Sequence, residues 1–348
     1  DKIGHLYKVN SFDFHRYEDT IKLADDPDYN QANFEGMLEI KGDTDHTKLI
    51  EMLDALNDES QKIDNVLDTY FDTENLVYWL AFQILTGNCD TQNRNCYLYS
   101  PLNSNTWYFL DWDNDGMLRK LELSLTGFSD YASWERGASN YWGNVLFNRA
   151  LRSKAFRGEL DRAVKDLRTY LTETRLTKMI KHYREVTESL VFASPDIDNL
   201  PVTKDQYEQI AAAIPSEIEE NYKSFRESFK KPMPFYIGVP QIDNGKLRIN
   251  WDASYDFEAR DIRYTVELAR DYAISDVVFK AEDVLLPEVT CDAPDTGQYF
   301  VRVRATNSDG YTQDAFDYYV TDDGKHYGMK CFYVQDGGKV VEDTYEEG

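Results

Sequence analysis

The feature that most constrains the fold of this chain is a change in hydrophobic periodicity near residue 231. Upstream of it, apolar residues recur with the spacing of amphipathic helices, and downstream they alternate with polar residues, as in half-buried strands. The chain has 348 residues, enough for about two domains of ordinary size. The sequence therefore predicts an α+β protein: a mostly helical domain over residues 1–231, a β-sandwich over 232–325 and a C-terminal extension over 326–348.

The helical part contains one segment that is apolar on all sides. Asp72 is placed to cap a helix that runs to about Thr86, and Gly87 stands just past its end. A helix that is apolar all round is expected to be central and buried. Later apolar residues fall on single helical faces and predict further helices: Phe156, Leu160, Ala163, Leu167 and Leu171; Leu176, Met179, Tyr183, Val186 and Leu190; Ile218, Tyr222, Phe225 and Phe229.

Two polar, acidic segments flank a predicted β-hairpin. Residues 96–99 and 107–110 have strand character and are joined by a turn, while the polar segments cover 87–95 and 111–116. The hairpin would bring the two segments close together in space. Crowded carboxylates repel one another unless a cation or a proton is present, so the pattern favours a divalent-metal site.

Spacing within these segments matches the needs of phosphoryl transfer. Asp90 and Asn95 form an Asp-x-x-x-x-Asn pattern. In protein-kinase catalytic loops that Asp accepts the acceptor proton, the Asn binds Mg²⁺, and a second Asp on a nearby strand holds the metal. Asp113, just after the second strand of the hairpin, is placed for that last role. Few hard oxygen ligands suit Mg²⁺, which completes its shell with water and phosphate.

At this point the sequence resembles a family. The motifs at residues 85–90, 95–99 and 107–115 look like the core of the spore-coat-protein-H (CotH) kinases, which are atypical kinases that are secreted or act at the spore surface. The opening at residues 4–8 and the run at 142–157 are also similar to that family. The resemblance covers roughly residues 3–230.

The resemblance implies Mg²⁺- or Mn²⁺-dependent phosphoryl transfer from ATP to the hydroxyl of a protein substrate, such as a coat or cell-surface protein. By carry-over Asp90 is the catalytic Asp, Asn95 and Asp113 are the metal ligands, and Asp115 is the second acid of the turn. It also implies an extracellular location or one on the spore or cell surface of a bacterium.

The nucleotide-binding residues are not assigned by sequence. The family's nucleotide lobe, with its phosphate-contacting Lys, precedes the segment at which this chain opens, so we expect a processed or truncated chain without that lobe. Neither a Gly-x-Gly-x-x-Gly nor a Walker-type pattern is present. Lys8 and Lys41 are candidates to reach a phosphate. Asp111 stands where the family often has Pro.

The strand-rich part resembles a fibronectin type III domain over roughly residues 235–322. A Trp on an early strand is followed by Tyr264 and then by alternating residues from Gly297 to Gly310. The resemblance implies a spacer or binding module without chemistry of its own.

A second interpretation of the acidic turn is structural. Residues 111–122 fit the EF-hand expression and end on Glu122, although a strand rather than a helix is predicted before them. Ca²⁺ is therefore the alternative occupant, in a non-catalytic secreted surface or adhesion module. Disulfide bonding of Cys89, Cys96, Cys291 and Cys331 stays open.

Net charge argues against a nucleic-acid partner, and the length of the apolar runs argues against a membrane-spanning segment. The 38 Lys and Arg residues are outnumbered by 63 Asp and Glu, which gives a net charge of −25. Such a surface repels a phosphate backbone, so we expect no nucleic-acid partner. The longest strongly apolar run, residues 76–85, is about half of the roughly twenty residues that a membrane span needs.

Overall fold

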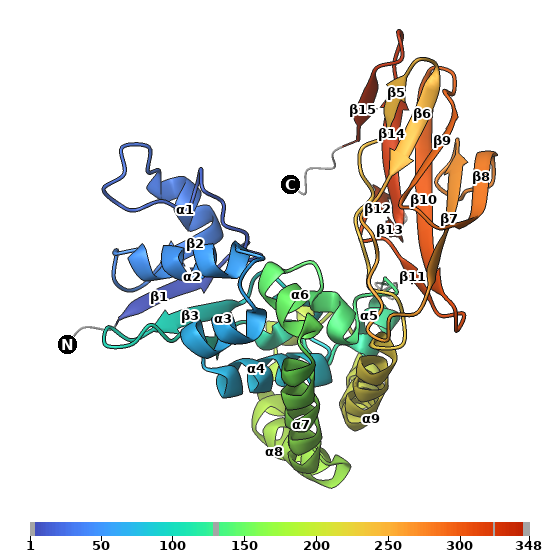
Figure 1. Ribbon diagram of the computed structural model, residues 1–348. Helices are drawn as coiled ribbons and strands as arrows, with labels where there is room; N and C mark the ends of the chain where they lie inside the picture. Colours follow the sequence, from blue (N-terminus) through green and yellow to red (C-terminus); the bar gives the residue numbers. More distant parts are fainter. Residues whose placement is uncertain (1–3, 128–131, 323, 344–348) are drawn as a thin grey trace. The chain divides into compact units, whose positions relative to one another are not determined.

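The computed structural model describes residues 4–127, 132–322 and 324–343 (Figure 1). The chain divides into two compact units, one formed by residues 1–129 and 136–225, the other by residues 130–135 and 226–348. The first unit is mostly helical and the second is built of antiparallel strands, so the α+β prediction is confirmed. None of the described helices combines the length and the apolar character that crossing a membrane requires.

The first unit pairs a small antiparallel sheet with helices. The strand order is β2-β1-β3-β4, and the predicted hairpin is confirmed as β3 and β4, which pair from Cys96↔Asp111 to Tyr99↔Tyr108. The strands are β1 (His5–Val9), β2 (Leu38–Ile40), β3 (Cys96–Ser100) and β4 (Tyr108–Asp111). The helices are α1 (Gln31–Met37), α2 (Thr47–Asn57), α3 (Ile63–Tyr70), α4 (Thr73–Thr86), α5 (Lys120–Thr126), α6 (Val145–Arg152), α7 (Lys154–Tyr170), α8 (Glu173–Val191) and α9 (Lys204–Ser228).

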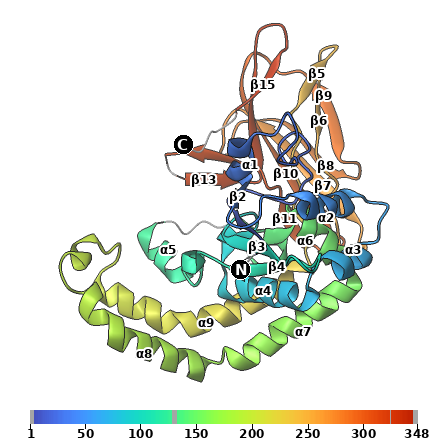
Figure 2. The ribbon, with the colours of Figure 1, turned by 90° about the vertical axis from the view of Figure 1, so that its left-hand side faces the viewer.

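Helix α4 is the buried centre of this unit, as its sequence predicts. The Asp72 carboxylate accepts a hydrogen bond from the Asn75 amide at 2.8 Å, and Gly87 ends the helix with a left-handed φ of 65°. Figures 1 and 2 show α4 between the sheet and α7, and it packs against both β4 and α7. The Trp79 ring lies 4.9 Å from Phe109 on β4, which ties helix and sheet into one core.

Strand β4 is attached along α4 by side-chain hydrogen bonds. The Asn75 side chain accepts from the Phe109 amide at 2.7 Å and donates to the Phe109 carbonyl at 3.1 Å. The Asp72 amide donates to the Trp107 carbonyl at 3.1 Å. Phe71 and Trp107 form a parallel bridge, so β4 runs in the same direction as α4. Both elements therefore end at the same edge of the unit.

The described strands of the second unit form three antiparallel sheets. One has the order β15-β14-β10-β7-β8 with β11 on β10, another has the order β5-β6-β9, and β12 pairs with β13. Buried residues of β6, β7 and β10 form one apolar cluster, among them Leu247, Val266 and Val301. The strands are β5 (Gln241–Asp243), β6 (Lys246–Asn250), β7 (Ile262–Ala269), β8 (Val277–Val284), β9 (Glu288–Asp292), β10 (Gly297–Asn307), β11 (Thr312–Asp314), β12 (Tyr318–Thr321), β13 (Gly324–Tyr327), β14 (Met329–Val334) and β15 (Val340–Glu342).

Two segments belong to this unit although the sequence assigns them elsewhere. The described part of residues 326–348 is not an extension outside the sheet, because β14 pairs with β10 and Phe332 is fully buried. Its irregular burial pattern hides the alternation that marks a strand. Residues 132–135 also join the second unit, where the Trp134 indole donates to the Ala315 carbonyl at 3.2 Å.

All four cysteines carry free thiols, which answers the question that the sequence leaves open. Cys96 and Cys331 are buried. Burial raises the pKa of Cys331 to about 12 and also raises that of Cys96, so both behave as apolar core residues.

A buried histidine makes the first unit sensitive to acid. His46 is fully buried; its Nδ1 lies 2.8 Å from the Tyr7 hydroxyl and its Nε2 3.3 Å from the Tyr29 hydroxyl. Burial lowers the pKa of His46; the charge of His5 acts in the same direction, whereas Asp45 and Asp43 act against it. The imidazole is therefore held neutral, one ring nitrogen donating to a hydroxyl and the other accepting.

We expect the stability of the first unit to fall as the pH drops below about 6.5. The unfolded chain binds a proton at His46 in that range and the folded chain does not, so acid favours unfolding. Melting temperatures between pH 7.5 and 5.5 measure the slope, which should flatten in His46→Gln. Part of the slope should remain, because burial also lowers the pKa of His5. An unchanged slope in the variant would contradict the assignment.

Candidate active site

The candidate site lies where α4 and β4 end and two loops meet. The loop after α4 contains Asp90, and the turn after β4 runs through Asp113 to Gly116. A Cβ at Gly116 would come within 2.7 Å of Asn88 Oδ1 and 3.4 Å of Asp90 Cβ. Asn88 is buried and hydrogen-bonded to Gln83, so it cannot easily move aside. The two acidic segments are thus in contact, as the hairpin predicts, and only glycine allows this approach.

The Asp-x-x-x-x-Asn pattern folds back on itself. Asp90 lies in a short 3₁₀ turn, and its Oδ2 accepts a hydrogen bond of 2.8 Å from the Asn95 amide nitrogen. Its Oδ1 lies 3.3 Å from Arg94 Nε. Because Asn95 donates through its nitrogen, its amide oxygen is directed away from Asp90 and can serve as a ligand.

The surroundings of Asp90 carry an excess of negative charge from nearby carboxylates. Burial raises the pKa of the Asp90 carboxyl, and the charges of Asp115 and Asp113 raise it further. Arg94 and the Asn95 hydrogen bond oppose the shift. Both acids of the turn therefore lie close enough to repel Asp90. A cation between the loop and the turn would relieve that repulsion.

The two predicted metal ligands sit at the ends of paired strands in left-handed backbone. Asn95 has a φ of 58° and directly precedes β3, and Asp113 has a φ of 55° two residues after β4. Asn and Asp adopt this conformation more readily than most residues. Since Cys96 pairs with Asp111, both side chains leave the same end of the hairpin.

The donor set fits a hard divalent cation that keeps much of its own shell. Asn95 offers an amide oxygen, and the exposed Asp113 and Asp115 offer carboxylates. Within the described part of the chain, no three His, Cys, Asp or Glu side chains form a ready-made metal cage. This pattern suits Mg²⁺ or Mn²⁺ with water and phosphate oxygens better than a fully protein-ligated ion.

The EF-hand pattern does not form an EF-hand. Strand β4, not a helix, precedes the loop. Glu122, the last residue of the pattern, pairs with Arg119 at 2.9 Å, and Asp111 accepts from Gln83 at 2.8 Å. The first and last acids of the expression are therefore engaged elsewhere.

An aromatic surface lies beside the acidic turn. The ring of Trp112, 43% exposed, stands edge-on to Tyr97 with centroids 5.2 Å apart. The Lys8 ammonium lies 5.5 Å from the Trp112 ring, because β1 pairs with β3 and sets Lys8 opposite Tyr97. Lys41, the other lysine suggested by the sequence, is paired with Glu39. The structure thus brings Lys8, and not Lys41, into contact with the residue that precedes Asp113.

Comparison with known proteins now identifies the first unit. The model of the family described as CotH kinase protein matches residues 1–225, about two thirds of the chain. The chain belongs to the CotH kinase family. The matched span contains both loops of the candidate site.

Comparisons with curated proteins and with solved structures give no further information on function. No curated protein matches the chain. Among solved structures, it is similar to the twitchin kinase region from C. elegans (Fn31-NL-kin-CRD-Ig26), with 18% identity and a TM-score of 0.21. That match covers 27% of this chain and 20% of the other, so the chain spans about a fifth of the twitchin structure and the likeness carries no argument.

The sequence-based predictions for this CotH family member did not include Gln83 among the residues of the site. Gln83 is fully buried on α4, donates to Asp111 at 2.8 Å and accepts from Asn88 at 3.0 Å. It therefore links the loop after α4 to the turn after β4. The signal was present in the sequence, since Gln83 is the single amide in an otherwise apolar stretch of that helix.

Residues that precede α6 form hydrogen bonds with the loop that contains Asp90. Asn144 donates to the Gln92 carbonyl at 2.8 Å and also caps α6 by accepting from Leu146 at 3.0 Å. The Tyr141 hydroxyl lies 2.9 Å from Thr91 Oγ1. These contacts satisfy loop carbonyls that would otherwise be buried without partners.

Contacts from α9 and from Arg136 support the end of α4, the start of the loop after it and the start of α5. Asn221 donates to the Leu85 carbonyl at 3.0 Å, and Arg136 donates to the Gly87 carbonyl at 3.1 Å. The Glu217 carboxylate accepts from the Lys120 amide at 3.3 Å, at the start of α5. Because α9 lies more than 90 residues away in sequence, no local pattern predicts these contacts.

We expect Tyr141→Phe to loosen the Asp90 loop while leaving the core packed. The change removes one buried hydroxyl and leaves Thr91 without that partner, a loss of about 1–3 kcal/mol in unfolding free energy. Urea titration measures that loss, and hydrogen exchange of residues 88–92 should speed up. Tyr78→Phe is the matched control, because the Tyr78 hydroxyl bonds Asp166 at the surface. An effect no larger than the control's would contradict the role of Tyr141.

Proposed function

We propose that this CotH family member transfers a phosphoryl group from ATP to the hydroxyl of a protein substrate, with Mg²⁺ or Mn²⁺. The observation that carries the proposal is the Asp90–Asn95 pair in contact with the turn that carries Asp113. Membership of a kinase family supports the same reaction class.

In the proposed reaction the acceptor oxygen attacks the γ-phosphorus, the bond to the β–γ bridging oxygen breaks, and ADP leaves. Asp90 orients the acceptor hydroxyl and takes its proton. Burial raises the pKa of Asp90, which strengthens it as a base, while Arg94 and the hydrogen bond from Asn95 favour its ionised form. The Asn95 amide oxygen and the carboxylates of Asp113 and Asp115 would hold the cation. When bound, that cation neutralises phosphate charge as it develops.

Lys8, Tyr97 and Trp112 are the residues we assign to nucleotide contact. The exposed Trp112 ring offers an apolar surface for the base. The Lys8 ammonium lies 5.5 Å from the centre of that ring, and we assign it to a phosphate oxygen.

For the second unit we propose a fibronectin type III-like β-sandwich that acts as a spacer or binding module. Support comes from the shared core of its two larger sheets and from the Trp251 and Tyr264 rings, 5.2 Å apart. We further propose that the protein acts outside the cell or at the spore or cell surface of a bacterium, on a coat or cell-surface protein.

Asp90→Asn should abolish transfer without unfolding the chain. The amide is isosteric and removes a partly buried charge, so the melting temperature should hold while the rate falls by roughly 10²–10⁴-fold. Labelling from γ-³²P-ATP with Mg²⁺ or Mn²⁺, onto a protein acceptor or the chain itself, measures the rate. Asp28→Asn, at a carboxylate that is 82% exposed, is the matched control. Full activity in Asp90→Asn would remove Asp90 from the mechanism.

Asp113→Asn should remove the stabilisation that Mg²⁺-ATP gives to the folded chain. Ligands that bind only the folded state raise the melting temperature, and the variant lacks a carboxylate for the cation. Thermal melting with Mg²⁺-ATP, with Mg²⁺ alone and with Ca²⁺ alone distinguishes the proposed kinase from a non-catalytic surface module.

The exposed acidic turn also suits a structural Ca²⁺ site in such a module. Stabilisation by Ca²⁺ alone, with no effect of nucleotide, would favour that alternative over the kinase.

A further inference from the structure

Residues 132–135 belong to the second unit, and Trp134 is the side chain that fixes them there. Only 7% of Trp134 is exposed. Its indole donates to the Ala315 carbonyl at 3.2 Å, and its ring meets the rings of Phe316 and Tyr327 edge-on, with centroids 4.9 Å and 6.2 Å away. A buried Trp whose N–H has a partner combines a large apolar contact with a directional one. It therefore anchors the short segment around it.

Ser133 adds polar attachment to the same segment. Its hydroxyl accepts a hydrogen bond of 2.7 Å from the Gln313 side chain and donates to the Asp314 carboxylate at 3.1 Å. Within the segment, the Glu135 carboxylate accepts from the Ala132 amide at 2.7 Å and closes a turn. Apolar and polar contacts together thus define the position of residues 132–135 in the second unit.

The next residue, Arg136, belongs to the first unit and supports the start of the Asp90 loop. Its guanidinium donates to the Gly87 carbonyl at 3.1 Å and to Asn221 Oδ1 at 3.4 Å, and the Glu217 carboxylate lies 4.0 Å away. A Cβ at Gly87 would collide with this guanidinium, so Arg136 packs directly on the residue that ends α4. Only 5% of the Glu217 side chain is exposed, and a buried carboxylate is costly without a nearby cation. The place of Arg136 is therefore narrowly defined.

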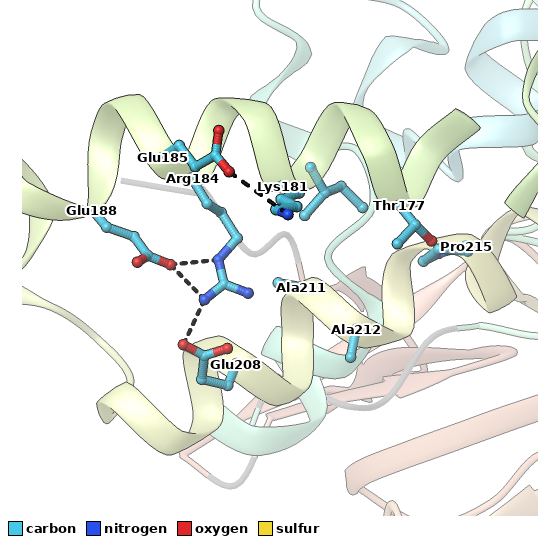
Figure 3. A pocket seen from close by; sticks show the side chains of 10 residues that line it. Thr177, Lys181, Arg184, Glu185, Glu188, Glu208, Ala211, Ala212 and Pro215 are labelled. Carbon is cyan, nitrogen blue, oxygen red and sulfur yellow. Dashed lines mark hydrogen bonds and ion pairs between the residues drawn. The ribbon is translucent and has the colours of Figure 1, made fainter. Parts of the chain in front are cut away.

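Helix α9, which carries two of the partners of Arg136, is fixed within the first unit. Arg184 on α8 donates to Glu208 on α9 at 2.5 Å, across a cavity of about 510 Å³ between the two helices (Figure 3). Arg168 on α7 donates to Glu219 on α9 at 2.7 Å. These bonds keep α9 in place from its own unit, so the contact of Arg136 depends on where its backbone is held.

One residue, Glu135, separates the Trp134 anchor from Arg136. Two backbone steps span at most roughly 7 Å, so the anchor limits how far the Arg136 backbone can move from its place. We propose that Trp134 is a positioning residue for the Asp90 loop, because its burial in the second unit keeps Arg136 on the Gly87 carbonyl. The second unit then supports the candidate site and is more than a spacer. The effect on catalysis rests on the proposed kinase function, whereas the effect on the loop does not.

Hydrogen exchange of the full chain, without nucleotide, tests this role. In Trp134→Ala the amides of residues 88–92 should exchange roughly tenfold faster, because the start of the loop loses its support. Trp134→Phe keeps a ring for the edge-on contacts and should restore most of the protection. Phe332→Leu is the matched control, since Phe332 is fully buried in the second unit and stacks on Tyr299, and the change removes none of the contacts of Trp134 described above. Unchanged exchange in Trp134→Ala, or an equal rise in Phe332→Leu, overturns the proposal.

A double-mutant cycle tests whether Trp134 acts through Arg136. Arg136→Met removes the guanidinium and should itself speed exchange of residues 88–92. Arg136→Lys, which keeps a positive charge beside Glu217, takes its place if that variant does not fold. Adding Trp134→Ala should then change the exchange little, because both substitutions remove the same support. Effects that multiply would show separate routes to the loop and refute the proposed one.

Labelling from Mg²⁺-ATP distinguishes this proposal from the kinase proposal. In an active chain, Trp134→Ala should lower the rate at saturating ATP by roughly tenfold and leave the half-saturating ATP concentration nearly unchanged, because Lys8, Tyr97 and Trp112 stay in place. An unaltered rate at saturating ATP would contradict the role of Trp134. If the unsubstituted chain transfers no phosphate, the kinase function alone fails, and hydrogen exchange decides the positioning role.

Discussion

The candidate site depends on the close contact between the turn after β4 and the loop after α4. Gly116 lies against Asn88 and Asp90 at a distance that no larger residue would allow. The buried amide of Gln83 bridges the same two segments. Without this contact the acidic side chains would sit on separate loops, too far apart to repel one another or to share a cation.

Rigid elements hold that contact in place from several sides. Strand β4 is bound along α4 through Asn75, so the two elements must end together. Asn144 before α6 donates to a carbonyl of the Asp90 loop, and Asn221 on α9 donates to the Leu85 carbonyl in the last turn of α4. The loop residues of the site are therefore held by buried polar side chains of neighbouring elements.

Charge is distributed unevenly over the molecule, and the distribution has chemical meaning. At the site, burial raises the pKa of Asp90 and the charges of Asp115 and Asp113 raise it further, while Arg94 and the hydrogen bond from Asn95 oppose the shift. The arrangement at the site suits a hard divalent cation.

The sequence by itself determined the class of fold, the two-part organisation and the identity of the acidic loops. The apolar run of α4, its capping Asp72 and the alternation of β6 depend on neighbours a few residues away, so local pattern was sufficient. The same holds for the Asp90–Asn95 spacing, which the structure closes into a hydrogen bond.

Only the tertiary structure decided what surrounds those residues. Asn221 and Glu217 act on the site from α9, more than 90 residues along the chain from their partners, and no periodicity encodes a contact across that distance. Strand β14 joins its sheet through pairing with β10, which a sequence pattern without clean alternation does not reveal. The face of α8 that includes Tyr183, Val186 and Leu190 has the periodicity of a core face, yet it is exposed. A pattern specifies which face is apolar, and packing decides whether that face is covered within one chain.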